Sequence, residues 1–251
     1  MNSLDLKLIG STLYFIDISI SKILLTTYEG DVLELDMKDA ENIDSRRINN
    51  IVKIDGVVNT FSVINEVDST LIYGGDNQIA TLINLNTNEP SDVINVGKKI
   101  TSIDTVCMKE NGFVTAIGCS SGEVFIRLNW ENELKKYDIF GDKTITEVKF
   151  GMDNSLLVVC TQDKDLFILA LNENNEYAKM KSLKTQDGFP VSVNFDGDFS
   201  KLLILTSNWK FTVVNLDKFM VSGLGDDDLN TNYWVSFNGR YIISPKSTSM
   251  L

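Results

Sequence analysis

One pattern of apolar residues recurs along almost the whole chain, and it limits the possible folds more than any other feature. Each copy contains a short apolar strand, a polar turn and a second, alternating strand. The apolar strands occupy residues 22–29, 70–76, 112–120, 155–161 and 201–207. A fixed position in the strand after the turn falls at Val32, Ile79, Val124, Leu166 and Phe211, which are 47, 45, 42 and 45 residues apart. The chain is therefore predicted to be built from repeated β units.

A second position in the repeat gives the same spacing. It lies near the end of the strand that precedes each pair, at Ile18, Val63, Thr105, Phe150, Phe195 and Phe237, with steps of 45, 42, 45, 45 and 42 residues. A repeat of this length is typical of one four-stranded blade of a β-propeller. We therefore predict an all-β fold, a single propeller domain over residues 1–251 with about six blades.

The predicted blades cover approximately residues 11–50, 51–97, 98–142, 143–187, 188–228 and 229–251. The last blade is short, because its third strand would be due near residue 253, beyond the final residue. A strand predicted at residues 4–10 would complete this blade and close the ring, so that no sheet edge stays exposed. The alternative is a fragment of a longer protein, whose open edge would favour strand-exchanged oligomers.

Composition excludes several kinds of chemistry. The chain has no histidine and a net charge of −12, so Ser–His and Cys–His catalysis are impossible and a common zinc ligand is missing. The negative charge repels nucleic acids and anionic lipids, and no phosphate-binding glycine motif occurs. We expect a protein that is not an enzyme, with no catalytic residues, no cofactor, no metal, and no nucleic-acid, membrane or small-molecule partner. An acidic-site hydrolase or sugar-binding propeller stays open; two inward carboxylates about 5–10 Å apart would favour it.

The cysteines and the first residues indicate the cellular compartment. Cys107, Cys119 and Cys160 lie in apolar strands without CxxC spacing, so we expect reduced thiols in the core. Charged residues interrupt the apolar stretch at residues 1–20, so we expect neither a signal peptide nor a membrane span. A cytoplasmic location is therefore predicted.

The repeat length, the polar hairpins and the alternating strands resemble those of WD repeats. The Trp-Asp dipeptide of that family is absent, and pairs such as Leu35-Asp36 and Val214-Asn215 stand in its place. Without histidine the family's Asp-His-Ser/Thr-Trp hydrogen-bond relay cannot form. We expect a WD-repeat-like propeller in which apolar packing replaces that relay.

From about residue 113 to 237, half of the chain, the order of features is similar to the second propeller of the echinoderm microtubule-associated-protein-like family. The resemblance rests on VTAIGCSSGEVFIRL (114–128), ITEVKFGMDNSLLVVCTQDKDLFIL (145–169) and FPVSVNFDGDFSKLLILTSNWKFTVVNL (189–216). It implies association with tubulin subunits or other cytoskeletal proteins through a face of the ring. The family's tandem first propeller and basic N-terminal region are absent from these residues, so direct microtubule binding is not implied.

These observations predict a non-catalytic scaffold that binds protein partners. The candidate interaction residues are Tyr28, Asp76, Asp163 and Trp209, which fall in equivalent hairpins between second and third strands and hence on one rim of the ring. Exposed aromatic residues are frequent interface anchors. The alternative for each residue is a plain solvent-facing turn, and the alternative function is an adaptor in trafficking or protein turnover.

Overall fold

The structure is a computed structural model that describes the chain in segments. They are residues 13–19, 22–27, 31–36, 48–53, 58–65, 70–84, 86–87, 89–108, 112–128, 133–138, 140–151, 154–196, 199–208, 210–218, 220–224, 234–235, 241–243 and 248–250. Side-chain surroundings are described for residues 60 and 62 and for these segments between residues 70 and 218.

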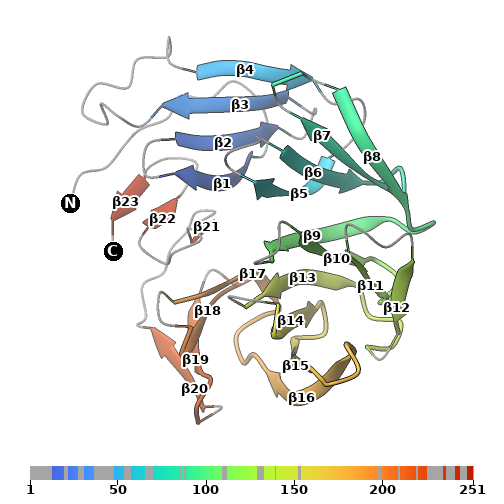
Figure 1. Cartoon of the computed structure of the whole chain (residues 1–251). Coiled ribbons are helices and arrows are strands. Elements are labelled where there is room, and N and C mark those ends of the chain that lie inside the picture. Colours follow the sequence, from blue (N-terminus) through green and yellow to red (C-terminus); the bar gives the residue numbers. More distant parts are fainter. Residues whose placement is uncertain are drawn as a thin grey trace.

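Among the described residues, six antiparallel sheets follow one another, and the strands of each sheet lie side by side in chain order (Figure 1). We call the sheets blades 1 to 6. Blade 1 contains β1 Leu13–Ser19, β2 Lys22–Thr27, β3 Asp31–Asp36 and β4 Ile48–Lys53. Blade 2 contains β5 Val58–Asn65, β6 Thr70–Gly75, β7 Ile79–Asn84 and β8 Glu89–Asn95. Blade 3 contains β9 Ile100–Cys107, β10 Phe113–Cys119, β11 Val124–Leu128 and β12 Leu134–Tyr137.

The second half of the chain repeats this plan. Blade 4 contains β13 Ile145–Phe150, β14 Leu156–Thr161, β15 Asp165–Leu171 and β16 Tyr177–Lys184. Blade 5 contains β17 Pro190–Phe195, β18 Lys201–Thr206, β19 Phe211–Asn215 and β20 Met220–Leu224. Blade 6 has three described strands, β21 Trp234–Val235, β22 Tyr241–Ile243 and β23 Thr248–Met250.

The first strands of the blades lie toward the centre of the ring and the fourth strands toward its outside (Figure 1). First strands of consecutive blades contact each other at β5–β9, β9–β13 and β13–β17. Burial in blade 4 is greatest in the second strand, since β14 is buried at five of its six positions, whereas the first strand β13 is buried at three of six and the fourth strand β16 is exposed at six of eight. A strand packed between two sheets reads as a continuous apolar run, whereas an outer strand carries polar residues.

The core consists of apolar layers between neighbouring blades. One layer joins blades 2 and 3 and includes Ile72, Ile103 and Ile117. The layer between blades 3 and 4 is larger and includes aromatic pairs, such as Phe140 against Phe167 with ring centroids 5.2 Å apart. Blades 3 and 4 are therefore each held between the faces of two neighbours, as expected for stacked repeats.

This arrangement confirms the predicted all-β architecture of repeated blades, about six in number. The five third-strand positions used as markers all lie in third strands, but Ile79 is one residue out of register. Gly74 pairs with Ala80, just as Gly118 pairs with Val124, so Ala80 is the true equivalent. The division of residues 1–251 into one domain with the stated boundaries stays a prediction.

Three further expectations have different outcomes. The sequence predicted that the third strand of blade 6 would fall near residue 253, beyond the chain. This prediction was wrong, because the third strand of blade 6, β23, forms at Thr248–Met250. The strand predicted at residues 4–10 lies outside the described residues. All three cysteines are free, but only Cys119 and Cys160 are buried, so the prediction of a core position was wrong for Cys107.

Candidate functional site

The hairpins that join second and third strands lie at one edge of the blades, together with the loops that lead into the next first strand. We call this edge the hairpin rim. Asp76 lies in the hairpin between β6 and β7, and Asp163 in the hairpin between β14 and β15. Tyr28 and Trp209 fall between the corresponding strands of blades 1 and 5 but lie outside the described residues. That these four residues bind a partner stays a prediction.

One turn geometry repeats in blades 2, 3 and 4. The backbone N–H of Gln78 donates to the carbonyl of Gly75, that of Gly122 to Cys119, and that of Lys164 to Thr161. The three donor residues have φ values of 66°, 92° and 69°. Left-handed residues of this kind match a tight hairpin to the twist of its strands. Asp76 and Asp163 consequently sit in equivalent hairpins, but Asp76 is the second residue of its turn and Asp163 the third.

The Asp76 hairpin is tied to the loop that enters blade 3. The Asp76 carboxylate lies 2.9 Å from Lys99 Nζ, and both side chains are half exposed. The carbonyl of Lys99 in turn accepts the backbone N–H of Ser120, in the next hairpin. An exposed ion pair of this kind contributes about 0–1 kcal/mol. The ion pair links the hairpin to the loop and leaves both side chains accessible to solvent.

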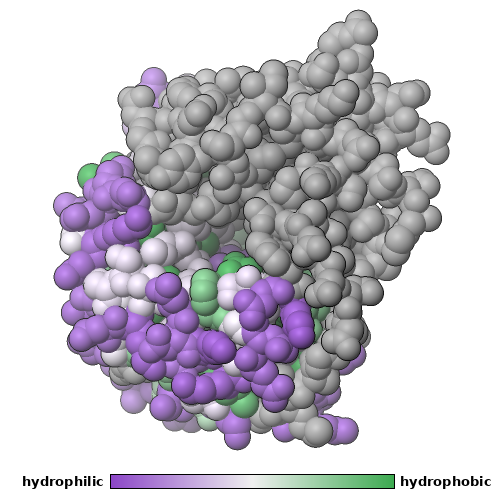
Figure 2. Space-filling view, turned by 180° about the vertical axis from the view of Figure 1, so that it is seen from behind, coloured by the Kyte–Doolittle hydropathy of each residue, from purple (hydrophilic) through white to green (hydrophobic). Residues whose placement is uncertain are grey.

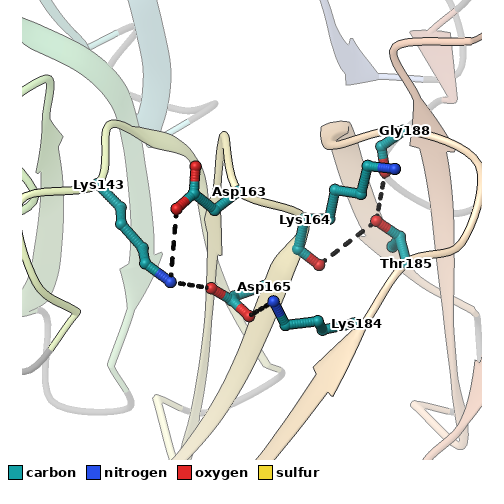
Figure 3. Close-up of polar contacts among 7 residues, drawn as sticks. All are labelled: Lys143, Asp163, Lys164, Asp165, Lys184, Thr185 and Gly188. Atoms are coloured by element: carbon teal, nitrogen blue, oxygen red, sulfur yellow. Dashed lines mark hydrogen bonds and ion pairs between the residues drawn. The ribbon is translucent and has the colours of Figure 1, made fainter.

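A stronger ionic network surrounds Asp163 in blade 4 (Figure 3). Lys143 Nζ lies 2.6 Å from Asp165 Oδ2 and 3.6 Å from Asp163 Oδ2, and Lys184 Nζ lies 3.3 Å from Asp165 Oδ1. The Asp165 side chain is 6% exposed, whereas that of Asp163 is 61% exposed. Burial alone would raise the pKa of Asp165, but the hydrogen bonds and charges of Lys143 and Lys184 outweigh it and hold this pKa below its usual value.

Blade 3 has a matching network around Glu123. Glu123 directly precedes Val124, the first residue of β11 that pairs with β10. Asp165 has the equivalent position in blade 4, directly before Leu166, which pairs with β14. Ser121 donates a hydrogen bond to Glu123, and Lys136 and Lys98 lie 3.1 Å and 4.0 Å from it. The Ser121 hydrogen bond, followed by the Lys136 contact, lowers the pKa of Glu123. The expectation of apolar packing in place of a polar relay was therefore wrong at this edge of blades 3 and 4.

The loop between blades 4 and 5 forms hydrogen bonds with Lys164, which follows Asp163 in the same hairpin (Figure 3). The carbonyl of Lys164 accepts the backbone N–H of Thr185 at 3.0 Å, and Lys164 Nζ donates to the carbonyl of Gln186 at 3.3 Å. The Thr185 hydroxyl also donates to the carbonyl of Gly188. Each hairpin is thus braced by a neighbouring loop, so the exposed Asp163 is presented on a supported backbone.

Polar side chains also connect the inner strands. The Thr60 hydroxyl oxygen accepts the backbone N–H of Ile103, and the Ser102 hydroxyl oxygen accepts that of Val148, each at 3.0 Å. Thr60, Ser102 and Glu147 occupy the same register position in β5, β9 and β13. A carboxyl group therefore replaces a hydroxyl at this position of blade 4.

The Glu147 carboxyl group belongs to a charged cluster at the contact of β9 and β13. Asp104, which is 6% exposed, accepts hydrogen bonds from Lys149 Nζ and from the backbone N–H of Phe150, both at 2.7 Å. Burial first, and the Asp104 charge second, raise the pKa of Glu147 to about 8, against the opposing effects of Lys149 and of a hydrogen bond with Ser102. The site therefore disfavours the ionised form of Glu147, whereas both carboxylate oxygens of Asp104 accept hydrogen bonds from blade 4.

Neither a metal site nor a membrane-spanning helix is found among the described residues. No group of three or more His, Cys, Asp or Glu side chains in that part of the chain is placed to hold a metal ion. Across the same residues, no helix has the length and apolar character needed to cross a membrane.

Comparison with solved structures decides the fold. The chain matches the crystal structure of the Cps50 (Swd1) β-propeller domain of Myceliophteria thermophila with a TM-score of 0.67, over 100% of both chains and at 8% sequence identity. The fold is a β-propeller. No protein-family model matches the chain, and no curated protein sequence matches it. The resemblance in sequence to the echinoderm microtubule-associated-protein-like family is thus not confirmed by these comparisons, and the likeness at 8% identity shows the propeller architecture alone.

Sequence reasoning missed the residues that brace the rim, namely Lys143, Asp165 and Lys184. A signal for them exists in the repeat, because Lys98 and Lys143 are 45 residues apart and Glu123 and Asp165 are 42 apart. Charged residues in turns are ordinarily solvated, which is why this spacing did not stand out.

Proposed function

We propose that this propeller is a non-catalytic, WD-repeat-like scaffold that binds protein partners through its hairpin rim. The observation that carries the proposal is the repeated bracing of hairpins by neighbouring loops, which presents Asp76 and Asp163 on a rigid support. Binding residues commonly lie in loops held by a rigid scaffold. Tyr28 and Trp209, from the corresponding hairpins, would add aromatic contacts to the same rim.

The identity of the partner is a finer proposal. A cytoskeletal partner, such as soluble tubulin, follows only from the sequence resemblance over residues 113–237. A cytoplasmic location follows from the spacing of the cysteines and from the charged residues within residues 1–20. Co-sedimentation with polymerised tubulin and capture of soluble tubulin test the partner. The absence of association in both assays would overturn the cytoskeletal assignment and leave an adaptor of trafficking or protein turnover. Fluorescence microscopy of the tagged protein tests the location.

A pair of charge-reversal variants tests the rim itself. The first variant carries Asp76→Lys and Asp163→Lys. The control carries Glu173→Lys and Asp217→Lys, two exposed acidic residues in hairpins between third and fourth strands, at the opposite edge of the blades. Both variants change the net charge equally, and both should fold, because exposed ion pairs contribute about 0–1 kcal/mol each.

The measurement is quantitative capture of partners from the cells that express the protein, followed by titration of the purified partner. We expect the rim variant to bind the partner about tenfold more weakly, as loss of two interface charges implies, and the control to bind as the original protein does. Equal binding by all three proteins would refute the rim as the interface.

An acidic-site hydrolase is the second candidate, and one feature favours it: burial, with the charge of the nearby Asp104, raises the pKa of Glu147 to about 8. A carboxylic acid with a raised pKa beside a second carboxyl group is the arrangement of glycosidases. Against this, Asp104 is occupied by Lys149 and a backbone N–H. Hydrolysis of a panel of 4-nitrophenyl glycosides, abolished by Glu147→Gln, would establish this activity; no turnover by the original protein would dismiss it.

A further inference from the structure

The outer strands of blades 3 and 4 carry a charge opposite to that of the whole chain. The protein has 35 acidic and 23 basic side chains. The strands β12 and β16 nevertheless contain five lysines and no acidic residue: Lys135, Lys136, Lys179, Lys181 and Lys184. The outer strand of blade 2, in contrast, carries Glu89 and Asp92 and no basic residue.

The two basic strands meet at the boundary between their blades. The Tyr137 hydroxyl oxygen accepts the backbone N–H of Tyr177 at 3.2 Å, and the two rings pack edge to face with centroids 6.2 Å apart. Lys135 Nζ reaches the carbonyl of Asn175 at 3.4 Å, in the turn that leads into β16. Blade 3 and blade 4 therefore form one continuous outer surface here.

Strand register places three of the lysines along this boundary. Lys135 pairs with Ile126 and Lys179 pairs with Leu169, and both of these partners belong to the apolar layer between blades 3 and 4. Lys184 pairs with Asp165, next to Lys143. Because residues paired across strands share a face of the sheet, Lys135 and Lys179 lie on facing sides of the two blades. We call Lys135, Lys179 and Lys184 the basic seam.

One feature of the seam, an exposed methionine, differs from ordinary edge protection. Lysines on an outer strand do discourage pairing with other sheets, and the register shift between Ile168 and Leu169 adds a bulge to β16. Yet Met180, which lies in that bulge, is 56% exposed and is one of two large apolar side chains that are more than half exposed among the described residues. Figure 2 shows how largely hydrophilic the described surface is on the face seen from behind. An exposed methionine between two lysines adds an adaptable apolar contact to a cationic surface.

The charges of the seam are only partly compensated. Lys184 forms an ion pair with Asp165. Lys179 Nζ lies 5.8 Å from the centre of the Phe167 ring, and within the described part of the chain no ion pair neutralises Lys179 or Lys135. At physiological salt the charges beyond about 8 Å are largely screened, so a ligand at the seam responds to these local lysines rather than to the net charge of −12.

We propose that the basic seam and Met180 form a second binding surface, which takes an extended, acidic segment of a partner protein that also carries an apolar side chain. The bulge in β16 prevents regular strand addition, so the segment is held through its side chains. Its carboxylates contact Lys135, Lys179 and Lys184, and its apolar residue contacts Met180. This surface is on the outer wall of the ring, and Lys184 is the one seam residue that also belongs to the ionic network behind the hairpin rim.

The test uses a fluorescein-labelled twelve-residue peptide that contains eight glutamates and two leucines. Its binding to the full chain is followed by fluorescence polarisation at low and at high salt. Two control peptides replace all glutamates by glutamine or by lysine. We expect binding of the acidic peptide alone, weakened about tenfold or more at the higher salt concentration, because exposed charge pairs are screened.

Three variants locate the site. Lys135→Glu with Lys179→Glu should weaken binding about tenfold or more, since two attractions become repulsions. The matched control, Lys201→Glu with Lys218→Glu, reverses two exposed lysines of blade 5 and should bind within about twofold of the original protein. Met180→Ser should weaken binding of the leucine-containing peptide a few-fold, as loss of one apolar contact implies, and leave that of an all-glutamate peptide unchanged. These effects together support the proposal.

Three results would overturn it. They are no binding by the original protein at low salt, equal binding of the glutamine peptide, and an equal loss in the seam variant and its blade 5 control. The last result would show that only the overall charge matters. Circular dichroism and thermal unfolding of each variant show whether it is folded, and the hairpin-rim variant should bind the peptide normally.

Discussion

Replacing Glu147 by glutamine should stabilise the protein, and the gain should grow as the pH rises. The Glu147 side chain is partly buried beside Asp104, Lys149 and the Cys160 thiol, and the raised pKa of about 8 shows that its ionised form is disfavoured there. Glutamine has the same shape and can keep a hydrogen bond with Ser102, but it cannot ionise. The variant therefore lacks one ionisable group but keeps the shape of the side chain and its hydrogen bond.

The direction of the pH effect follows from the difference between the pKa of Glu147 in the unfolded chain and its pKa in the folded protein. Unfolded, Glu147 titrates near its ordinary pKa of 4.5, whereas in the folded protein it titrates near 8. Below pH 4.5 both states are protonated and the group has no effect. Between these values the unfolded state loses its proton first, so the free energy of unfolding falls as the pH rises and levels off above pH 8.

The magnitude has an upper bound. A difference of one pKa corresponds to 1.36 kcal/mol, so the interval from 4.5 to about 8 corresponds to about 5 kcal/mol at most. Because Glu147 is only partly buried, solvent screening reduces this figure, and we expect about 2 kcal/mol above pH 8. Near pH 5 the difference between the variant and the original protein should be clearly smaller than above pH 8.

Urea unfolding at several pH values between 5 and 9 measures the difference directly. The control is Glu176→Gln, at an exposed glutamate in the turn before β16, which should leave the pH dependence of stability unchanged. A difference between Glu147→Gln and the original protein that stays constant across this range would refute the raised pKa. A variant that is less stable at pH 8 would show that the ionised carboxylate is needed in the folded state.

Two further predictions concern packing and thiol access. In Gly118→Ala the new Cβ would lie 2.5 Å from Ile145 Cγ2 and 3.1 Å from Ile145 Cβ. We therefore expect the free energy of unfolding to fall by about 1–3 kcal/mol, seen as a lower melting temperature. An unchanged melting temperature would contradict this close approach of blades 3 and 4. Ellman's reagent should label Cys107 alone in the folded protein and all three cysteines in urea. The reason is that burial raises the pKa of Cys119 to about 12 and that of Cys160 well above its usual value. Rapid labelling of three thiols in the folded state would show that this core opens.

The repeat predicted the blades because the alternation of apolar residues has a physical cause that acts in every copy. Each sheet packs between two others, so its second and third strands must be apolar at matching positions. Exact register is harder to predict from this pattern. Ile79 was chosen as a marker because it is large and apolar, yet Ala80 is the residue paired with Gly74. A small residue at the equivalent position carries too weak a hydrophobic signal to be recognised.

The candidate sites were less predictable, because they depend on contacts between blades. The hairpins of Asp76 and Asp163 follow from the repeat alone, since every second strand must turn into a third. The approach of Lys135 to the turn before Tyr177 does not, because these residues are about 40 positions apart and meet only when blade 3 packs on blade 4. Sequence therefore indicates which edge a residue occupies, whereas the charge of a surface shared by two blades follows only from their packing. This difference explains why a chain with a net charge of −12 can present a basic seam on its outer wall.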